Sequence, residues 1–113
     1  MKIIVQKFGG TSVATAEARI AARNKVSDAI KAGFTPAVVV SAMGRKGDPY
    51  ATDSLIEIIK KENSAVDSRD LDTIMCCGEL ISAAVMAASL QSVGINAAAL
   101  TGGQAGIKTD AHF

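Results

Sequence analysis

The sequence predicts an α/β fold with an open, mainly parallel sheet. Residues 3–8 form a short apolar run, a helical pattern with an apolar stripe follows over 15–32, and a second apolar run occupies 36–41. Strand, helix and strand in this order indicate a parallel pair joined by a crossover helix. The first run is apolar almost throughout, which is typical of a strand covered on both faces. We therefore expect a three-layer αβα arrangement.

The first helix has clear start and stop signals. Thr15 suits the N-cap position, and Glu17 suits the first turn beside the positive end of the helix dipole. Gly33 fits the left-handed conformation that ends many helices. Pro36 then opens the second strand, a position where proline is tolerated.

A polar loop over residues 42–51 follows the second strand. It contains two glycines and a proline, which exclude regular structure. Ligands bind at the carboxyl ends of strands in open α/β sheets, so this loop is a candidate part of a site. Thr52 or Asp53 can cap the next helix, which should run to residue 62.

A long helical pattern over residues 69–93 comes next, with Ser68 as its expected cap. Gly78 lies inside the pattern, so we expect either two abutting helices or one helix with an irregularity. The second half is apolar nearly all round and should be deeply buried. Residues 96–101 predict a third strand.

The chain stops four residues after 107–109, which read as the start of a further strand. No helix closes that strand. We therefore expect the 113 residues to be an incomplete part of a larger domain.

The bulk composition favours a cytoplasmic protein. The net charge is +1, which gives no electrostatic case for nucleic acid or membrane surfaces as partners. The longest apolar stretch, 83–90, is short and interrupted by serine, so we expect no membrane span. Glycines and a lysine interrupt the N-terminal apolar run early, unlike a signal peptide.

The two cysteines, Cys76 and Cys77, are adjacent in a helical pattern. Neighbouring side chains on a helix point in different directions, so these two thiols should not form a disulfide with each other. With a single histidine in the chain, we expect no metal-ligand cluster. Both cysteines are expected to be free thiols in the core.

The segment KFGGTSV at residues 7–13 is the strongest candidate for a ligand site. A lysine at a strand end leads into two glycines, two hydroxyls and a helix start. Glycines allow backbone N–H groups to approach a bound group, and a helix N-terminus favours anions. The lysine adds a mobile positive charge. The segment thus predicts a cradle for nucleotide phosphates, although a plain βα turn has the same generic pattern.

Four segments together resemble the aspartokinases of the amino-acid kinase family. They are KFGGTSV at 7–13, VVVSAMG at 38–44, CGE at 77–79 and TGGQAG at 101–106, in family order along essentially the whole chain. The resemblance implies the amino-acid kinase fold, here incomplete. It also implies ATP-dependent phosphorylation of the side-chain carboxylate of L-aspartate to 4-phospho-L-aspartate, the first step towards lysine, threonine and methionine.

The resemblance assigns roles to residues of the first segment. Lys7 is implied as the catalytic cation, and the phosphate-binding set is Lys7, Gly9, Gly10, Thr11 and Ser12. The implied partners are L-aspartate and ATP with Mg²⁺. A homo-oligomer is expected.

Three further residues are implied in substrate binding: Ser41, Thr52 and Glu79. Each has a structural alternative. Ser41 could simply end a strand, and Thr52 could be only an N-cap, since residues 45–51 lengthen the loop relative to the family pattern. Glu79 could be an acid at a helix start after a break, or a buried carboxylate that holds the substrate ammonium. Arg45 and Lys46 are expected to be solvated.

Other family parts do not occur in residues 1–113. Aspartokinases carry a later GRGGSD segment, a pocket for the nucleotide base, and regulatory ACT domains. We therefore expect an N-terminal portion of the kinase domain that is inactive alone, with ATP and Mg²⁺ bound largely by other parts of the parent. Two alternatives stay open: a kinase of glutamate, acetylglutamate or carbamate, and a non-catalytic α/β module that binds an anion or a partner.

Overall fold

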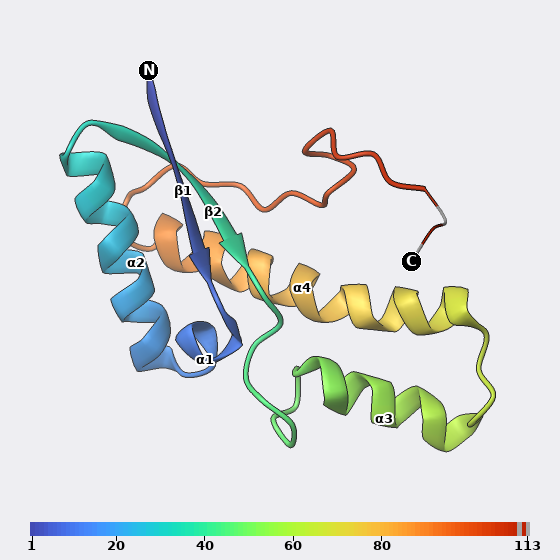
Figure 1. The fold of residues 1–113 in the computed structure, drawn as a ribbon. Coiled ribbons are helices and arrows are strands. Elements are labelled where there is room, and N and C mark those ends of the chain that lie inside the picture. The colour runs from blue at the N-terminus through green and yellow to red at the C-terminus, as the bar shows by residue number, and fades with distance from the viewer. Residues whose placement is uncertain (111, 113) are drawn as a thin grey trace.

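The computed structural model describes residues 1–110 and 112. Its elements, in chain order, are β1 (Lys2–Phe8), α1 (Gly10–Val13), α2 (Ala16–Lys31), β2 (Phe34–Val40), α3 (Thr52–Glu62) and α4 (Ser68–Gln91). The two strands pair in parallel over their whole length, with α2 as the connection between them (Figure 1). The predicted strand–helix–strand unit is confirmed. The one-turn helix α1 was not predicted.

Within the described residues, helices pack on one face of the sheet. Side chains alternate between faces along each strand, and the inward row packs against α2 and α4. The outward row is exposed and includes large apolar side chains: Ile3, Val5 and Val39 are 62%, 69% and 45% exposed. The expectation of a strand covered on both faces is therefore wrong within the described residues. They form two of the three predicted layers of an incomplete α/β fold.

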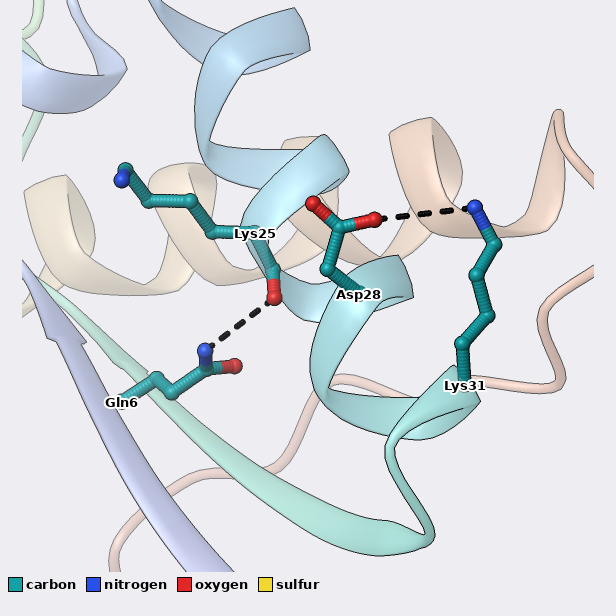
Figure 2. Close-up of polar contacts among 4 residues, drawn as sticks. All are labelled: Gln6, Lys25, Asp28 and Lys31. Atoms are coloured by element: carbon teal, nitrogen blue, oxygen red, sulfur yellow. Dashed lines mark hydrogen bonds and ion pairs between the residues drawn. The ribbon is translucent and has the colours of Figure 1, made fainter.

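Helix α2 begins and ends where the sequence predicts. The Thr15 hydroxyl accepts a hydrogen bond from the Ala18 N–H at 3.1 Å, and Gly33 follows the helix with a φ of 86°. Gln6 of β1 ties the sheet to this helix, because its amide nitrogen donates to the Lys25 carbonyl at 3.2 Å (Figure 2).

Figure 2 also shows the ion pair between Lys31 and Asp28, at 3.6 Å. Both side chains are about three-quarters exposed, at 74% and 73%. A pair so open to water contributes little to stability. The position of α2 on the sheet therefore rests on its buried residues, among them Ala22 and Val26.

Helix α4 is a single helix that continues through Gly78, so the alternative of two abutting helices is wrong. Asp67 caps it in place of Ser68, since the Asp67 carboxylate accepts from the Arg69 N–H at 2.8 Å. One stripe of the helix is buried: Gly78, Ser82, Met86, Ala87 and Leu90. The rest is partly or fully exposed, so deep burial of the whole second half is also wrong.

By length and composition alone, α4 could cross a membrane. The shortness of the apolar stretch 83–90 therefore does not decide whether α4 spans a membrane. Core helices of soluble proteins pass the same test, and the buried stripe of α4 packs against α2, α3 and β2.

Residues 96–101 and 107–109 form no strand in the described part of the chain, so both predicted strands are wrong there. The segment after α4 is held by other bonds: the Gln91 side-chain amide donates to the Ala97 carbonyl at 2.8 Å, and the Ile95 N–H donates to the Leu90 carbonyl at 3.2 Å. Ile95 and Ala97 pack on the core. An apolar run becomes a strand only where a neighbouring strand offers a hydrogen-bond ladder.

The core lies between the inward face of the sheet, α2 and α4. Its buried cluster consists of Phe8, Val13, Ala22, Val26, Met43, Met86 and Leu90. Cys76 and Cys77 are exposed free thiols on α4. Their predicted place in the core is wrong, because the buried stripe of α4 begins one residue later at Gly78.

Candidate functional site

The carboxyl ends of β1 and β2 bring two of the predicted segments together. Phe8 is the ladder partner of Val40, and the Ser41 N–H donates to the Phe8 carbonyl at 3.2 Å. Gly9 and Ser41 therefore follow neighbouring strand ends. The phosphate segment (residues 7–12) and the β2–α3 loop (residues 41–51) meet at this edge of the sheet (Figure 1).

Lys7 is exposed and belongs to the outward row of β1, with Ile3 and Val5. Its side chain therefore projects from the sheet face opposite α2 and α4. Its partner in the ladder, Val39, lies in the same exposed row. The ammonium group is accessible to a ligand approaching the strand ends from that side.

The two glycines of the segment have different surroundings. A Cβ on Gly9 would find no atom within 4 Å, so the space beside this residue is open. A Cβ on Gly10 would lie 2.7 Å from the carbonyl oxygens of both Ala42 and Gly44. The Gly44 N–H also donates to the Gly10 carbonyl at 3.0 Å. Gly9 leaves room for a ligand, whereas Gly10 allows two backbone segments to touch.

Helix α1 continues the segment with two exposed hydroxyl residues, Thr11 and Ser12. The Ser12 N–H donates to the Gly9 carbonyl at 2.9 Å, which closes the turn. The first N–H groups of a helix have no carbonyl within that helix to donate to. A helix of four residues adds only a small dipole, so Lys7 supplies the main positive charge.

The β2–α3 loop carries the predicted substrate residues at its two ends. Ser41 directly follows β2, and Thr52 is the first residue of α3; both are half-buried. The N-cap of α3 is Ala51, and no side chain caps this helix. The interpretation of Thr52 or Asp53 as a simple N-cap is therefore wrong, and capping does not engage the Thr52 hydroxyl.

A carboxylate organises the middle of this loop. The Asp48 side chain accepts from the Arg45 N–H at 2.8 Å, and the Asp48 N–H donates to the Arg45 carbonyl at 2.9 Å. Arg45 and Lys46 are exposed, as expected for solvated charges. The loop is longer than most but has a defined turn at its centre.

Glu79 is exposed in the middle of α4. It is neither at a helix start nor a buried carboxylate, so both predicted environments are wrong. The residue before it, Gly78, is at a close contact: a Cβ there would lie 2.9 Å from the Ala42 Cβ and 3.1 Å from the Leu55 Cδ1. Glu79 therefore lies next to the point where α4 touches the β2–α3 loop and α3.

Arg19 is the residue that sequence reasoning missed. Its Nη1 donates to the carbonyls of Val13 and Ala14 at 2.9 and 3.0 Å, and it reaches the Met43 sulfur at 3.8 Å. The signal was available in the sequence, because position 19 lies three residues before Ala22 on the stripe of α2 that faces the core. A charged residue on an apolar stripe needs a partner.

The described part of the chain has hollows on two sides of the loop and helix packing. One of about 390 Å³ lies between the start of α2 and the β2–α3 loop, with Arg19, Gly44 and Tyr50 in its lining. The other, of about 950 Å³, lies along the first half of α4 and includes both cysteines. Neither of these two hollows is lined by a predicted site residue.

Metal-ligand side chains do not gather in residues 1–110 and 112: no group of three or more His, Cys, Asp or Glu could hold an ion there. His112 has a partner that the sequence did not suggest, the Asp110 carboxylate at 3.2 Å, and both side chains are well exposed.

Lys7 and the open Gly9 at the end of β1 therefore lie beside Ser41 at the end of β2, in an α/β fold with a parallel strand pair. The family model described as "Amino acid kinase family" matches residues 2–112, so the chain belongs to the amino acid kinase family.

Its relatives within that family are aspartokinases. Aspartokinase 1 of Bacillus subtilis (strain 168) is 53% identical over 110 residues, which are 97% of this chain and 27% of that protein. The aspartokinase of Geobacillus stearothermophilus is 42% identical, with 97% and 26% covered. A crystal structure of aspartate kinase from Synechocystis matches with a TM-score of 0.72 and 35% identity, over 80% of this chain and 15% of that one.

These matches confirm the resemblance to aspartokinases and the α/β fold class. The chain spans about a quarter of the length of the curated relatives.

Proposed function

We propose that this chain is the substrate and phosphate part of an aspartate kinase, which transfers the γ-phosphoryl group of ATP to the side-chain carboxylate of L-aspartate. The observation that carries the proposal is the meeting of the phosphate segment and Ser41 at neighbouring strand ends, with Lys7 exposed beside the open Gly9. The relatives are named aspartokinases, and we infer L-aspartate as the substrate from those names. The product, 4-phospho-L-aspartate, would lead towards lysine, threonine and methionine.

The chemistry needs positive charge more than a base. A carboxylate is already an anionic nucleophile, so no proton has to be removed before it attacks the γ-phosphorus. The obstacle is the repulsion between two anions, which positioning and a fixed cation reduce. A unit charge 4 Å away contributes about 1 kcal/mol in water and about 4 kcal/mol at an effective dielectric of 20. Lys7 therefore acts most strongly when water is excluded from the outward face of the sheet.

The substrate side follows from the β2–α3 loop and α4. We assign the hydroxyls of Ser41 and Thr52 as donors to the aspartate, and the Glu79 carboxylate as the acceptor for its ammonium group. Because no side chain caps α3, the Thr52 hydroxyl is available for this role. Gly9, Gly10, Thr11 and Ser12 complete the phosphate side with Lys7.

ATP and Mg²⁺ fit these residues to different degrees. The exposed Lys7 and the open space at Gly9 suit phosphate oxygens. The described residues offer no carboxylate cluster for Mg²⁺, which prefers an octahedral set of oxygen ligands. We therefore assign no step to the metal from this chain. A cytoplasmic homo-oligomer is the setting we propose for the parent enzyme.

A substrate panel tests the proposed function. The protein, expressed from its complete reading frame, is given ATP with L-aspartate, L-glutamate, N-acetylglutamate or carbamate. ADP is measured, and hydroxylamine traps any acyl phosphate as a hydroxamate. We expect turnover with L-aspartate. Turnover only with another acceptor would support the kinase alternative, and ligand binding without turnover would support a non-catalytic module. The 113-residue chain alone should be inactive.

A further inference from the structure

We propose that Arg19 is a positioning residue: its guanidinium fixes helix α1, and with it the phosphate segment, against the β2–α3 loop. The inference rests on the proposed function. It adds a residue that lies outside all four segments that indicated the family. Arg19 lies on α2 and is half-buried, so its contacts lie in the interior between the two site segments.

The first part of the argument is the end of α1. The last carbonyl groups of a helix have no donor within the helix. Arg19 supplies donors to two carbonyls at this end, because its Nη1 reaches those of Val13 and Ala14 at 2.9 and 3.0 Å. Its positive charge also suits the negative end of the helix. A helix of four residues is too short to be stable by itself, so these bonds help to define its position.

The second part is the contact across to the loop. The same Nη1 lies 3.8 Å from the sulfur of Met43, which is buried in the core at 7% exposure. The neighbours of Met43 are the two residues whose carbonyl oxygens lie against Gly10. The loop therefore touches α1 at its start through Gly10, and Arg19 joins the loop to α1 at its end.

The consequence concerns the geometry of transfer. Gly10 and Arg19 together hold the turn that follows Lys7 between α2 and the loop that begins with Ser41. Displacement of a reacting group by about 1 Å can cost on the order of a hundredfold in rate. Loss of the Arg19 bonds should therefore affect turnover more than the stability of the fold.

Arg23 provides a matched control on the same helix. It lies one turn further along α2, is also half-buried, and its Nη1 donates to the Ser92 hydroxyl at 3.3 Å, beyond the end of α4. Replacing Arg23 removes the same charge and the same kind of side chain. Its recorded hydrogen bond joins α2 to the region after α4 and leaves α1 and the β2–α3 loop untouched.

The test compares R19A, R19K, R23A and R23K in the protein expressed from its complete reading frame. At saturating ATP and L-aspartate, kcat should fall at least tenfold in both Arg19 variants and stay within twofold of the parent in both Arg23 variants. Lysine is included because it keeps the charge but lacks the planar fork that serves two carbonyls. If R19A does not fold, the kcat of R19K alone tests the proposal. A folded R19K with kcat within twofold of the parent would overturn the proposal.

Amide hydrogen exchange gives a readout that does not need activity. Exchange of the amides of residues 10–14 should speed up in R19K and remain unchanged in R23K, relative to the parent protein. Unchanged exchange there in R19K would also overturn the proposal. If the parent protein shows no aspartate-dependent turnover, the proposed function fails, while exchange still decides whether Arg19 holds α1.

Discussion

At the scale of single residues, Gly9 and Gly10 show how two identical neighbours can serve different ends. The N-cap residue Gly9 has extended backbone angles, φ −72° and ψ 171°, which any residue can adopt, and open space beside it. Gly10 has the Ala42 and Gly44 carbonyl oxygens at the place where a Cβ would stand. Gly9 therefore leaves space for the proposed ligand, whereas Gly10 allows two backbone segments to pack.

The substitution Gly10→Ala should destabilise the fold by about 1–3 kcal/mol, because the β2–α3 loop must move to make room. Gly9→Ala should change the free energy of unfolding by no more than about 0.5 kcal/mol. In the complete protein it should instead raise KM for ATP, since a methyl group enters the open space. Urea unfolding and steady-state kinetics measure the two effects. Equal loss of stability in both variants would contradict the distinction.

The sequence could predict Lys7 and Ser41 as neighbours, because both follow from the rule that parallel strands end at one edge of a sheet. It could not predict the exposure of Glu79. Whether a carboxylate in the middle of a helix is covered depends on elements far away in the chain. The position of Arg19 on the core-facing stripe could indicate that it needs a partner, but the partners themselves could not be predicted, because the contacts join residues up to 24 positions apart.

At the scale of elements, the start of α2 is the best-defined helix end. The Thr15 hydroxyl accepts from the Ala18 N–H, and Glu17 lies in the first turn. A hydrogen bond from its own backbone N–H, then one from Thr15, and the nearby charge of Arg19 hold the pKa of Glu17 below its ordinary value of 4.5. The ionised carboxylate therefore stabilises the folded state.

This lowered pKa predicts the sign of a pH effect. A carboxyl group with a depressed pKa in the folded state contributes stability above its unfolded pKa, and the contribution disappears as pH falls through the folded pKa. The thermal midpoint should therefore drop below about pH 4.5, and Glu17→Gln should make that drop smaller. Thermal unfolding from pH 3 to 7 measures both curves. A steeper drop in the Gln variant would contradict this account.

Helix α4 offers a second test at the scale of elements. Alanine is a better helix former than glycine by about 1 kcal/mol, so propensity alone predicts that Gly78→Ala stabilises the protein. The close contacts with Ala42 and Leu55 predict the reverse, a net loss of about 1–2 kcal/mol from overpacking. Chemical denaturation measures the sign. The exposed neighbour Cys77→Ala is the control, with an expected change within about 0.5 kcal/mol.

The helices and the two strands could be predicted because their signals are local. Thr15, Gly33 and the apolar stripe of α2 all lie within the element that they define. The predicted strand over 96–101 shows the limit of local signals: pairing needs a partner strand, and in the described residues this segment instead packs through Ile95 and Ala97. Exact caps were missed by one residue, at Ala51 and Asp67, because several neighbouring residues could begin either helix.

At the scale of the whole molecule, the main feature is the exposed apolar row on the sheet. Ile3, Val5 and Val39 lie on the face opposite α2 and α4, and Lys7 ends the same row. Exposed large apolar side chains gathered on one sheet face favour association. If another part of the protein covers this face, the apolar side chains would exclude water around the Lys7 ammonium group.

The two faces of β1 should respond differently to a polar substitution in the 113-residue chain. Val5→Thr replaces an outward side chain and should reduce self-association with a stability change within about 0.5 kcal/mol. Ile4→Thr places a hydroxyl on the inward face and should cost about 1–3 kcal/mol. Analytical ultracentrifugation and urea unfolding measure these effects. Equal stability losses in the two variants would show that the outward face is not exposed.

The central claim is that the end of β1 is where phosphoryl transfer occurs. The most direct measurement is aspartate-dependent ADP formation by Lys7→Ala in the protein expressed from its complete reading frame, with Lys2→Ala as control. Lys2 is an exposed lysine at the opposite end of the same strand. We predict that Lys7→Ala lowers kcat by about 10²–10³ and that Lys2→Ala leaves it unchanged. Full turnover by the folded Lys7→Ala protein would contradict the account.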